Sequence, residues 1–221
     1  MKTYLWKINK QKLDKTNLAL YSNFIKKKYK VDAGYDFNKI WKWSVENSVL
    51  FWKSIWDFTN VKGDVGKILF KKSDIFFKNK FFPEAKLSYA KNILVKNNKD
   101  PAIIFKSENN YKTILSWQEL NLKVAKISNW MRFVGIKKGD RVAAYLPNIP
   151  EAVIAYISTS VVGAVWSSCS PDFGTKSVID RFSQIEPRIL FIGEIYFYNG
   201  KKINILERLN KIIKNVPSIN K

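Results

Sequence analysis

The chain has 221 residues, 46% of them hydrophobic and 15% aromatic, so it is long enough to bury a core and too apolar to be disordered. It contains no histidine and one cysteine, Cys169, which excludes an intrachain disulfide, Ser-His-Asp or Cys-His catalysis and a histidine-ligated zinc site. The formal net charge of +21 rests on 39 basic residues, only five of them arginines, so we predict a solvated lysine surface rather than a nucleic-acid partner, with a charge-selected partner as the alternative.

The N-terminal segment MKTYLWKINKQK predicts no signal peptide, because it has neither an apolar core nor a small-residue cleavage site. A single thiol fits a reducing compartment, and we expect a cytoplasmic protein. The uncharged stretch Ala152–Pro171 approaches the length of a membrane span. Because serine, threonine and glycine fall within it, we interpret it as a buried helix that runs into a buried strand, and we expect no membrane partner.

Two amphipathic helices are predicted near the N-terminus. The first covers residues 13–30, and its predicted inner face consists of Leu13, Asn17, Leu20, Phe24 and Tyr29. The second covers residues 38–58 and carries apolar side chains at helical spacing: Trp41, Val45, Val49, Trp52 and Trp56. We predict that this stripe docks the helix on the main body of the protein; a platform that stacks on a ligand is the alternative.

Residues 59–86 have no periodic pattern and are interpreted as irregular. Within them, Lys78–Pro83 is predicted to cross the surface with its phenylalanines as anchors. A short helix is predicted at residues 87–95, and a turn at Asn97–Pro101.

From residue 102 the pattern becomes regular. Ala102–Phe105 and Lys112–Leu115 predict a β-hairpin, because they are short apolar runs around a Glu-Asn-Asn turn. Ser116 and Glu119 form a capping box that begins a helix. The predicted inner face of that helix is Leu120, Val124, Ile127, Met131 and Val134. Gly135 supplies its left-handed C-terminal cap.

The stretch Gly139–Pro187 alternates short apolar runs with helix-length segments, which is typical of βαβ units and a parallel sheet. Three parallel strands are predicted: Arg141–Leu146, Ala164–Ser167 and Ile189–Ile192. The segment 151–162 is apolar around most of its circumference and predicts a helix buried on more than one side, begun by Pro150. The sequence therefore predicts an α/β fold, with N-terminal helices followed by βαβ units and a largely parallel sheet.

A second connecting helix is predicted at residues 176–186, capped by Thr175 or Asp172. After the third strand, Asn199-Gly200 predicts a turn. Residues 204–215 predict a basic final helix.

Several motifs in this region form a recognisable set. Trp117–Leu120 (WQEL) opens a helix, Gly139–Val142 (GDRV) precedes Leu146–Ala152 (LPNIPEA), and Trp166–Gly174 reads WSSCSPDFG. In these motifs the chain resembles the adenylate-forming acyl-CoA synthetases. The WSSCSPDFG motif is most similar to their acetoacetate–CoA ligase branch, since acetyl- and propionyl-CoA synthetases resemble H-S-x-x-F-G-G-F there. The resemblance covers most of the chain, from about Trp41 onward.

The resemblance implies an acid–thiol ligase. Such enzymes use ATP to convert a carboxylate, whose charge resists nucleophiles, into an acyl-adenylate, and then transfer the acyl group to the thiol of coenzyme A. ATP, Mg²⁺ and coenzyme A are the expected cofactors, and acetoacetate, ATP and coenzyme A the expected substrates, of the full-length enzyme. The implied fold is part of the large N-terminal domain, with residues 1–100 as a helical cap and residues 101–221 as the first, incomplete α/β subdomain of the AMP-binding domain.

Other parts of such an enzyme do not occur in this sequence. The family holds the triphosphate in a Ser/Thr/Gly-rich loop that ends in Gly-x-Pro-Lys, whose backbone N–H groups bind anions. The nearest string, Gly174–Ser177, lacks the glycines and is interpreted as a helix start. The ribose-binding aspartate and the C-terminal domain with its catalytic lysine are also missing. We therefore expect an N-terminal fragment that is inactive alone, with no catalytic residue, no metal ligand and no securely bound cofactor.

The resemblance implies one binding site within the chain. Related synthetases contact the nucleotide end of coenzyme A with an Arg-Ala-Gly-Arg turn, which corresponds by position to Tyr198–Lys201. Gly200 matches the glycine and Lys201 keeps one charge suited to a phosphate, so both are predicted to bind coenzyme A. An ordinary Asn-Gly turn is the alternative. The loop Ser167–Gly174 is predicted to shape the coenzyme channel, and Cys169 to be a small buried side chain.

Two further functions stay open. One is a non-catalytic α/β domain that binds an anion or another protein. The other is a ligase for a different short-chain acid, since the acyl pocket is expected to lie largely outside this sequence.

Overall fold

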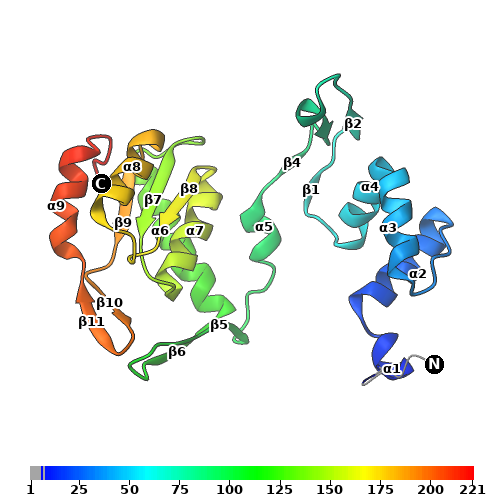
Figure 1. The fold of residues 1–221 in the computed structure, drawn as a ribbon, viewed down its shortest axis with the longest axis horizontal. Helices are drawn as coiled ribbons and strands as arrows, with labels where there is room; N and C mark the ends of the chain where they lie inside the picture. Colours follow the sequence, from blue (N-terminus) through cyan, green and yellow to red (C-terminus); the bar gives the residue numbers. More distant parts are fainter. Residues whose placement is uncertain (1–5, 7) are drawn as a thin grey trace. The chain divides into compact units, whose positions relative to one another are not determined.

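The computed structural model, which describes residue 6 and residues 8–221, divides the chain into two compact units (Figure 1). The first unit ends at Leu87 and the second spans Ser88–Lys221. Each unit is built around hydrophobic clusters of its own. The N-terminal segment for which no signal peptide is predicted lies partly outside the described residues.

Helices dominate the described part of the first unit. They are α1 (Lys10–Leu13), α2 (Asn17–Tyr29), α3 (Phe37–Glu46) and α4 (Ser48–Phe58). Thr16 caps α2 by accepting the Ala19 N–H at 3.2 Å, and Asp36 caps α3 by accepting the Asn38 N–H at 2.8 Å. These short polar side chains satisfy backbone donors that a helix start leaves without partners, so they fix where the helices begin.

The core of the first unit joins α2, α3 and α4. Its buried members are Tyr21, Ile25, Ala33 and Ile40, and its partly buried members include Trp43, Phe51, Ile55 and Phe58. The Tyr21 hydroxyl and the Ser54 hydroxyl lie 2.6 Å apart, so the two buried polar groups satisfy each other.

Each of the two predicted N-terminal helices is divided into two shorter helices. The residues predicted to form their inner faces are therefore partly wrong. The predicted helix 38–58 divides at Asn47, whose backbone leaves the helical region (φ −128°, ψ 47°). As a result three residues of the predicted stripe are 46–63% exposed: Trp41, Val45 and Trp52. The predicted helix 13–30 divides between Leu13 and Asn17, and Leu20 is exposed while Ile25 is buried. Docking of the stripe on the main body stays a prediction.

Residues 59–87 form two small antiparallel ladders. β1 (Gly63–Asp64) pairs with β4 (Lys86–Leu87), and β2 (Phe70–Lys71) pairs with β3 (Lys80–Phe81) across the 3-10 turn η1 (Phe76–Lys78). The ring of Phe81 lies 6.2 Å from that of Trp52, and the ring of Phe82 lies 5.5 Å from that of Trp56. The aromatic anchors predicted for this crossing are therefore confirmed.

The second unit opens with α5 (Tyr89–Ile93) and the antiparallel hairpin β5 (Pro101–Lys106) and β6 (Lys112–Ser116). Helix α6 (Trp117–Phe133) follows directly. The predicted capping box is confirmed, because Ser116 accepts the Glu119 N–H and the Glu119 carboxylate accepts the Ser116 N–H at 2.8 Å. Gly135 has the left-handed backbone (φ +83°) predicted for the helix end.

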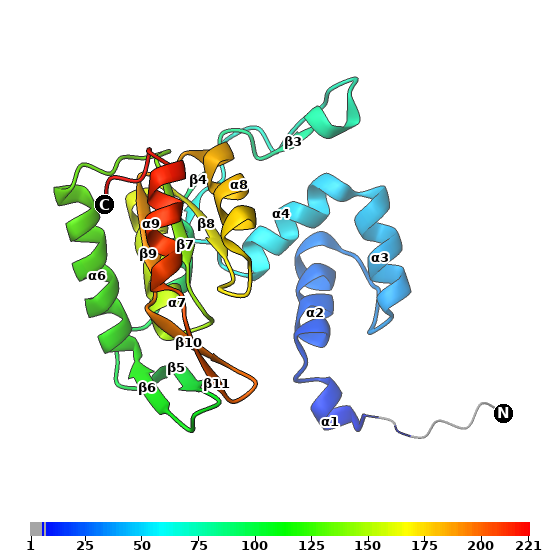
Figure 2. The same ribbon diagram turned by 60° about the vertical axis from the view of Figure 1, so that its left-hand side comes forward.

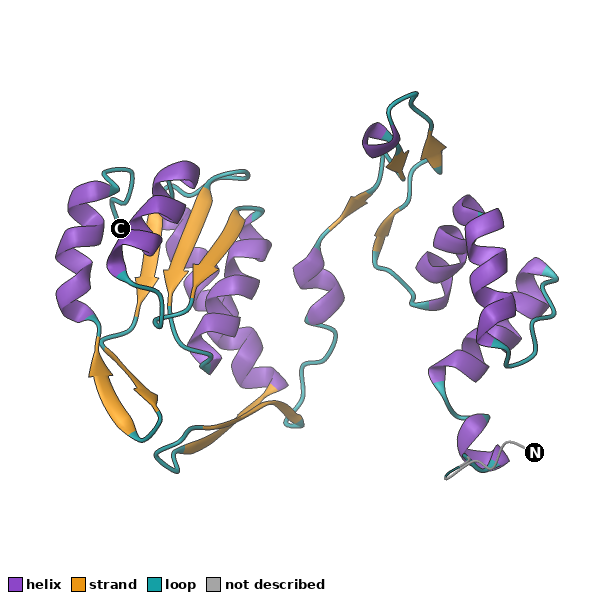
Figure 3. Cartoon of the chain, in the orientation of Figure 1, coloured by secondary structure: helices purple, strands orange, loops and turns teal. Residues whose placement is uncertain are grey.

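A parallel sheet forms the centre of the second unit (Figure 3). Its strands are β7 (Arg141–Tyr145), β8 (Val165–Cys169) and β9 (Ile189–Ile192), in the order β8-β7-β9. The connecting helices are α7 (Pro150–Val162) and α8 (Thr175–Ile185). The predicted parallel βαβ arrangement is confirmed, and β8 runs two residues further than predicted.

Helices cover both faces of this sheet (Figure 2). On one face Val142 and Ile189 pack with Met131 of α6 and Val162 of α7. On the other face Ala143 and Tyr145 pack with Phe182 of α8 and with α9 (Leu206–Asn215). Successive strand residues point to opposite faces, so a sheet buried on both sides reads as a continuous apolar run.

The last part of the chain returns to the edge of β9. Strands β10 (Ile195–Tyr198) and β11 (Lys201–Asn204) form an antiparallel hairpin before α9. After α9, the Asn220 N–H donates to the Arg188 carbonyl at 3.2 Å, and the Leu190 N–H donates to Lys221 at 3.1 Å. The final residues therefore lie along the free edge of β9.

The start of α8 differs from the prediction. Gly174 is the N-cap and no side chain caps the helix, so neither Thr175 nor Asp172 plays the predicted part. The Asp172 carboxylate instead accepts a hydrogen bond from the Ser170 hydroxyl at 2.9 Å. The prediction that Gly174–Ser177 is a helix start is confirmed.

Candidate functional site

The crevice at the carboxyl ends of β7 and β9 is the candidate functional site. From β7 the chain turns into α7 on one face of the sheet, and after β9 it turns into the β10–β11 hairpin and then α9, which packs on the other face. Loops that diverge from two neighbouring parallel strands leave a crevice between them, which is the usual ligand position in an open α/β sheet.

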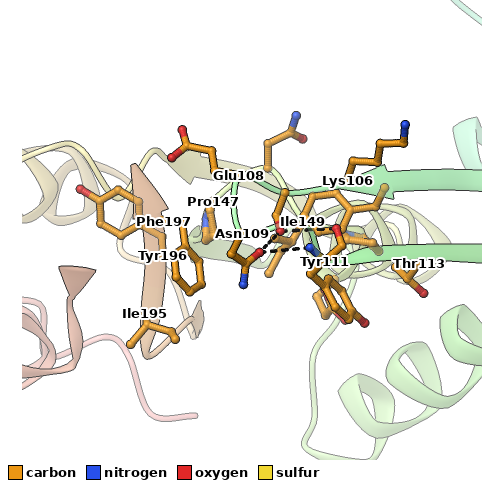
Figure 4. Close-up of a pocket in the computed structure, with 15 residues that line it drawn as sticks. Lys106, Glu108, Asn109, Tyr111, Thr113, Pro147, Ile149, Ile195, Tyr196 and Phe197 are labelled. Atoms are coloured by element: carbon orange, nitrogen blue, oxygen red, sulfur yellow. Dashed lines mark hydrogen bonds between the residues drawn. The ribbon is translucent and has the colours of Figure 1, made fainter. Parts of the chain in front are cut away.

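Two cavities open at this crevice, and both are lined by Ile149 and Glu151. The first has a volume of about 470 Å³ and lies between the β5–β6 loop, residues 147–151 and β10 (Figure 4). The second has a volume of about 540 Å³ and lies between α6, the start of α7 and the end of β9. Its apolar walls include Ile127, Leu146, Ile154, Phe191 and Ile192. Both volumes fall in the range that small-molecule sites occupy.

The LPNIPEA motif builds the rim shared by these cavities. The Ile149 N–H donates to the Pro147 carbonyl at 2.9 Å, which closes a tight turn directly after β7. Pro150 then occupies the first helical position of α7, where its missing N–H costs nothing. The motif therefore serves to end the strand and start the helix at the crevice.

The GDRV motif acts at the opposite, amino end of the strands. The Lys137 N–H donates to the Asp140 carboxylate at 2.8 Å, and this bond, together with the Arg188 guanidinium at 2.8 Å, lowers the pKa of Asp140. Arg141 donates to the Ile185 carbonyl at 2.6 Å, at the end of α8. The motif therefore ties β7 to β9 and α8, away from the crevice.

The predicted coenzyme-binding residues lie on the turn between β10 and β11. Asn199 (φ 51°) and Gly200 (φ 72°) both have positive φ, which matches the two-residue hairpin turn predicted from Asn-Gly. Lys201 is exposed. The Gly200 N–H donates to a carboxylate oxygen of Glu108 at 3.0 Å, so the turn already holds one anionic oxygen. The binding of coenzyme A at Gly200 and Lys201 stays a prediction.

A partly buried hydrogen-bond cluster holds the loop that follows β8. The Tyr145 hydroxyl lies 3.0 Å from the Pro171 carbonyl and 2.7 Å from the Phe173 carbonyl. Arg208 of α9 donates to the Tyr145 hydroxyl at 2.5 Å and to the Pro171 carbonyl at 2.9 Å. The Arg181 guanidinium lies over the Phe173 ring, 4.8 Å from its centroid. The WSSCSPDFG segment is thus fixed from three elements.

Comparison with known proteins identifies the family. Residues 92–220, more than half of the chain, match the family of AMP-binding enzymes. The chain belongs to this family.

Its relatives agree with the assignment. An acetoacetyl-coenzyme A synthetase from Rhizobium meliloti is 38% identical over 82% of this chain, and one from Gallus gallus is 36% identical over 84%. A solved structure of the Streptomyces lividans acetoacetyl-CoA synthetase superposes with a TM-score of 0.91 over 99% of this chain at 30% identity. The chain spans 28% of the length of these curated relatives and 34% of the solved chain.

Cys169 is buried at the end of β8, as predicted. Burial raises the pKa of its thiol, and the nearby Arg181 charge offsets this only in part. The neutral thiol predominates at physiological pH, so the side chain acts as a small apolar group.

The described residues lack a metal-binding cluster and a membrane-spanning helix. They contain no group of three or more His, Cys, Asp or Glu side chains placed to hold a metal ion. None of their helices is both long enough and apolar enough to span a bilayer. The stretch Ala152–Pro171 instead divides into α7 and β8, as interpreted from its sequence.

Sequence reasoning missed Glu108, Tyr145 and Arg208. Glu108 meets Gly200 across 92 positions, and no local pattern indicates such a contact. The role of Arg208 could have been suspected from composition, because arginine is scarce in this lysine-rich chain. A guanidinium is chosen where several acceptors must be met in fixed directions.

Proposed function

We propose that this chain forms the N-terminal part of an acetoacetate–CoA ligase. The reaction converts ATP, acetoacetate and coenzyme A into acetoacetyl-CoA, AMP and diphosphate through an acyl-adenylate. The observation that carries the proposal is the match of 35–38% identity, over most of the chain, to proteins named acetoacetyl-CoA synthetase. The order of the WSSCSPDFG loop supports it, because three elements hold this segment in one conformation.

Within that enzyme we assign Gly200 and Lys201 to the nucleotide end of coenzyme A. Two observations fit an anionic ligand there: the Gly200 N–H already donates to a carboxylate oxygen, and Lys201 and Lys202 are exposed beside it. Glu108 would have to leave the turn, since its charge repels a phosphate. The chemistry that coenzyme A supplies is a thiol that accepts the acyl group.

We assign no residue of this chain to ATP or Mg²⁺. The part proposed for residues 1–100 is a helical cap, and the part proposed for residues 101–221 is the first α/β subdomain of the AMP-binding domain. The cytoplasm is the proposed compartment.

A chimeric protein tests the proposal. This chain, joined at Lys221 to the remaining part of the Rhizobium meliloti relative, is assayed for acetoacetate-dependent exchange of pyrophosphate into ATP. Two matched controls are the complete relative and the relative without its N-terminal part. Exchange restored to the truncated relative supports the proposal, and a folded chimera that exchanges no faster than the truncated relative would contradict it.

A further inference from the structure

The hairpin of residues 70–81, called here the basic finger, is the most unusual surface of the first unit. It consists of β2, the turn η1 and β3 (Figure 3). At its base the tilted rings of Phe70 and Phe81 lie with centroids 4.9 Å apart, and Phe81 also contacts Trp52. The finger is therefore fixed on α4 by its base while its turn points away from the packed rings.

The turn carries apolar side chains that are exposed to solvent. Phe76 is 89% exposed and Phe77 is 81% exposed, and Ile75 before them is 44% exposed. Single exposed apolar side chains are ordinary, but three in sequence at the end of a hairpin are not.

The turn is also ordered. The Lys78 N–H donates to the Ile75 carbonyl at 2.9 Å, and the Ser73 N–H donates to the Asn79 side-chain oxygen at 2.8 Å. An ordered turn presents its two rings without a further loss of conformational freedom, which favours their burial in a partner.

Four lysines of the same hairpin gather at one surface cavity. Lys71, Lys72, Lys78 and Lys80 line a surface cavity of about 490 Å³ together with Ser73 and Asp74. Four positive charges stand against one negative charge, and among the described residues none of these lysines lies within ion-pair distance of a carboxylate.

We propose that the basic finger docks this chain on an anionic lipid surface. Phe76 and Phe77 would enter the boundary between headgroups and acyl chains, and the four lysines would contact lipid phosphates, because a long lysine stem lets the charge stay in the headgroup layer. The charge favours a lipid over a protein partner, because four lysines on the same hairpin as an exposed aromatic turn match the layered order of an anionic bilayer. The proposal takes up the charge-selected partner left open by the composition and replaces the expectation of no membrane partner for this surface.

Sedimentation with vesicles tests the proposal. The full chain is mixed with vesicles of phosphatidylcholine and phosphatidylglycerol, and with vesicles of phosphatidylcholine alone. Binding to the mixed vesicles and none to the neutral ones is expected. Phe76→Ser with Phe77→Ser should lower the partition coefficient at least tenfold, whereas the equally exposed Phe133 (89%), changed to serine, should leave it unchanged.

The charge requirement is tested with a matched set. Changing Lys71, Lys72, Lys78 and Lys80 to glutamine should weaken binding by roughly fivefold for each lysine removed. The same change at Lys10, Lys12, Lys211 and Lys214, which removes equal charge elsewhere, should have a much smaller effect. Equal losses in the two sets would overturn the proposal, because net charge alone would then explain binding. Full displacement by millimolar inorganic phosphate would also overturn it in favour of a site for free anions.

Discussion

Three side chains donate hydrogen bonds to the carboxylate of Asp57. Lys28 donates to its carboxylate at 2.7 Å, Lys53 at 2.5 Å and the Tyr29 hydroxyl at 3.0 Å. Burial acts to raise the pKa of Asp57, but these hydrogen bonds outweigh it and lower the pKa to about 2. Burial and the same contact raise the pKa of Tyr29 to about 12. The carboxylate therefore ties the end of α2 to α4.

Acid should weaken the first unit through Asp57. Because the pKa is lower in the folded state, the stabilisation is present above about pH 4 and is lost as the pH falls toward 2. The loss is about 2 kcal/mol, since one pKa unit corresponds to about 1.4 kcal/mol. Urea unfolding followed by tryptophan fluorescence at pH 6, 4 and 2 measures it. Asp57→Asn should be less stable at pH 6 and show a flatter acid dependence; an unchanged dependence would exclude Asp57 as its source.

We predict that Lys201 contributes to the binding of coenzyme A. If it contacts a phosphate of coenzyme A, Lys201→Gln in the chimeric enzyme should raise the KM for coenzyme A roughly tenfold, the cost of one hydrogen bond to a charged group. Exchange of pyrophosphate into ATP precedes the coenzyme step and should not change. Lys211→Gln, an exposed lysine on α9, is the control. An unchanged KM for coenzyme A in both variants would favour the alternative interpretation, an ordinary Asn-Gly hairpin turn.

The elements of the second unit could be predicted because their signals are local. Three short motifs each predict one local backbone conformation: the capping box at Ser116, the glycine after α6 and the Asn-Gly turn. The buried faces of the N-terminal helices could not be predicted, because apolar residues occur on more than one side of each helix. Asn47 breaks the helical pattern between Trp43 and Phe51, and a periodicity that assumes an unbroken helix then selects the wrong stripe.

Substitutions of Trp43 and Trp41 test which side of α3 is buried. Trp43 packs with Tyr29 and Phe51 at ring distances of 6.3 and 6.1 Å, whereas Trp41 is 58% exposed. Trp43→Ala should therefore cost about 3 kcal/mol of unfolding free energy, and Trp41→Ala less than about 0.5 kcal/mol. Urea denaturation of both variants measures the difference. A larger loss for Trp41 would restore the docking stripe predicted from the sequence.

For the molecule as a whole, the strands that frame the candidate site could be predicted from the sequence. The side-chain contacts within the site could not. The βαβ pattern predicts parallel strands, and a crevice at the carboxyl ends of neighbouring strands is the general consequence of such a sheet. The contacts of Glu108 with Gly200 and of Arg208 with Tyr145 join distant segments. Such contacts depend on how the hairpins and α9 fold back, which spacing along the chain does not encode.

The chain by itself should not exchange pyrophosphate into ATP with acetoacetate. Adenylation needs several groups around one phosphorus, and such groups do not contribute independently. We assign none of them to this chain. Exchange above a protein-free blank by the purified chain would mean that the segment carrying the chemistry lies within these 221 residues.

The chimeric protein joined at Lys221 tests the central claim most directly. If this chain is the N-terminal part of an acetoacetate–CoA ligase, it should restore acetoacetate-dependent ATP–pyrophosphate exchange to the truncated Rhizobium meliloti relative. A chimera that is soluble and folded by circular dichroism, yet exchanges no faster than the truncated relative, would contradict the proposed function.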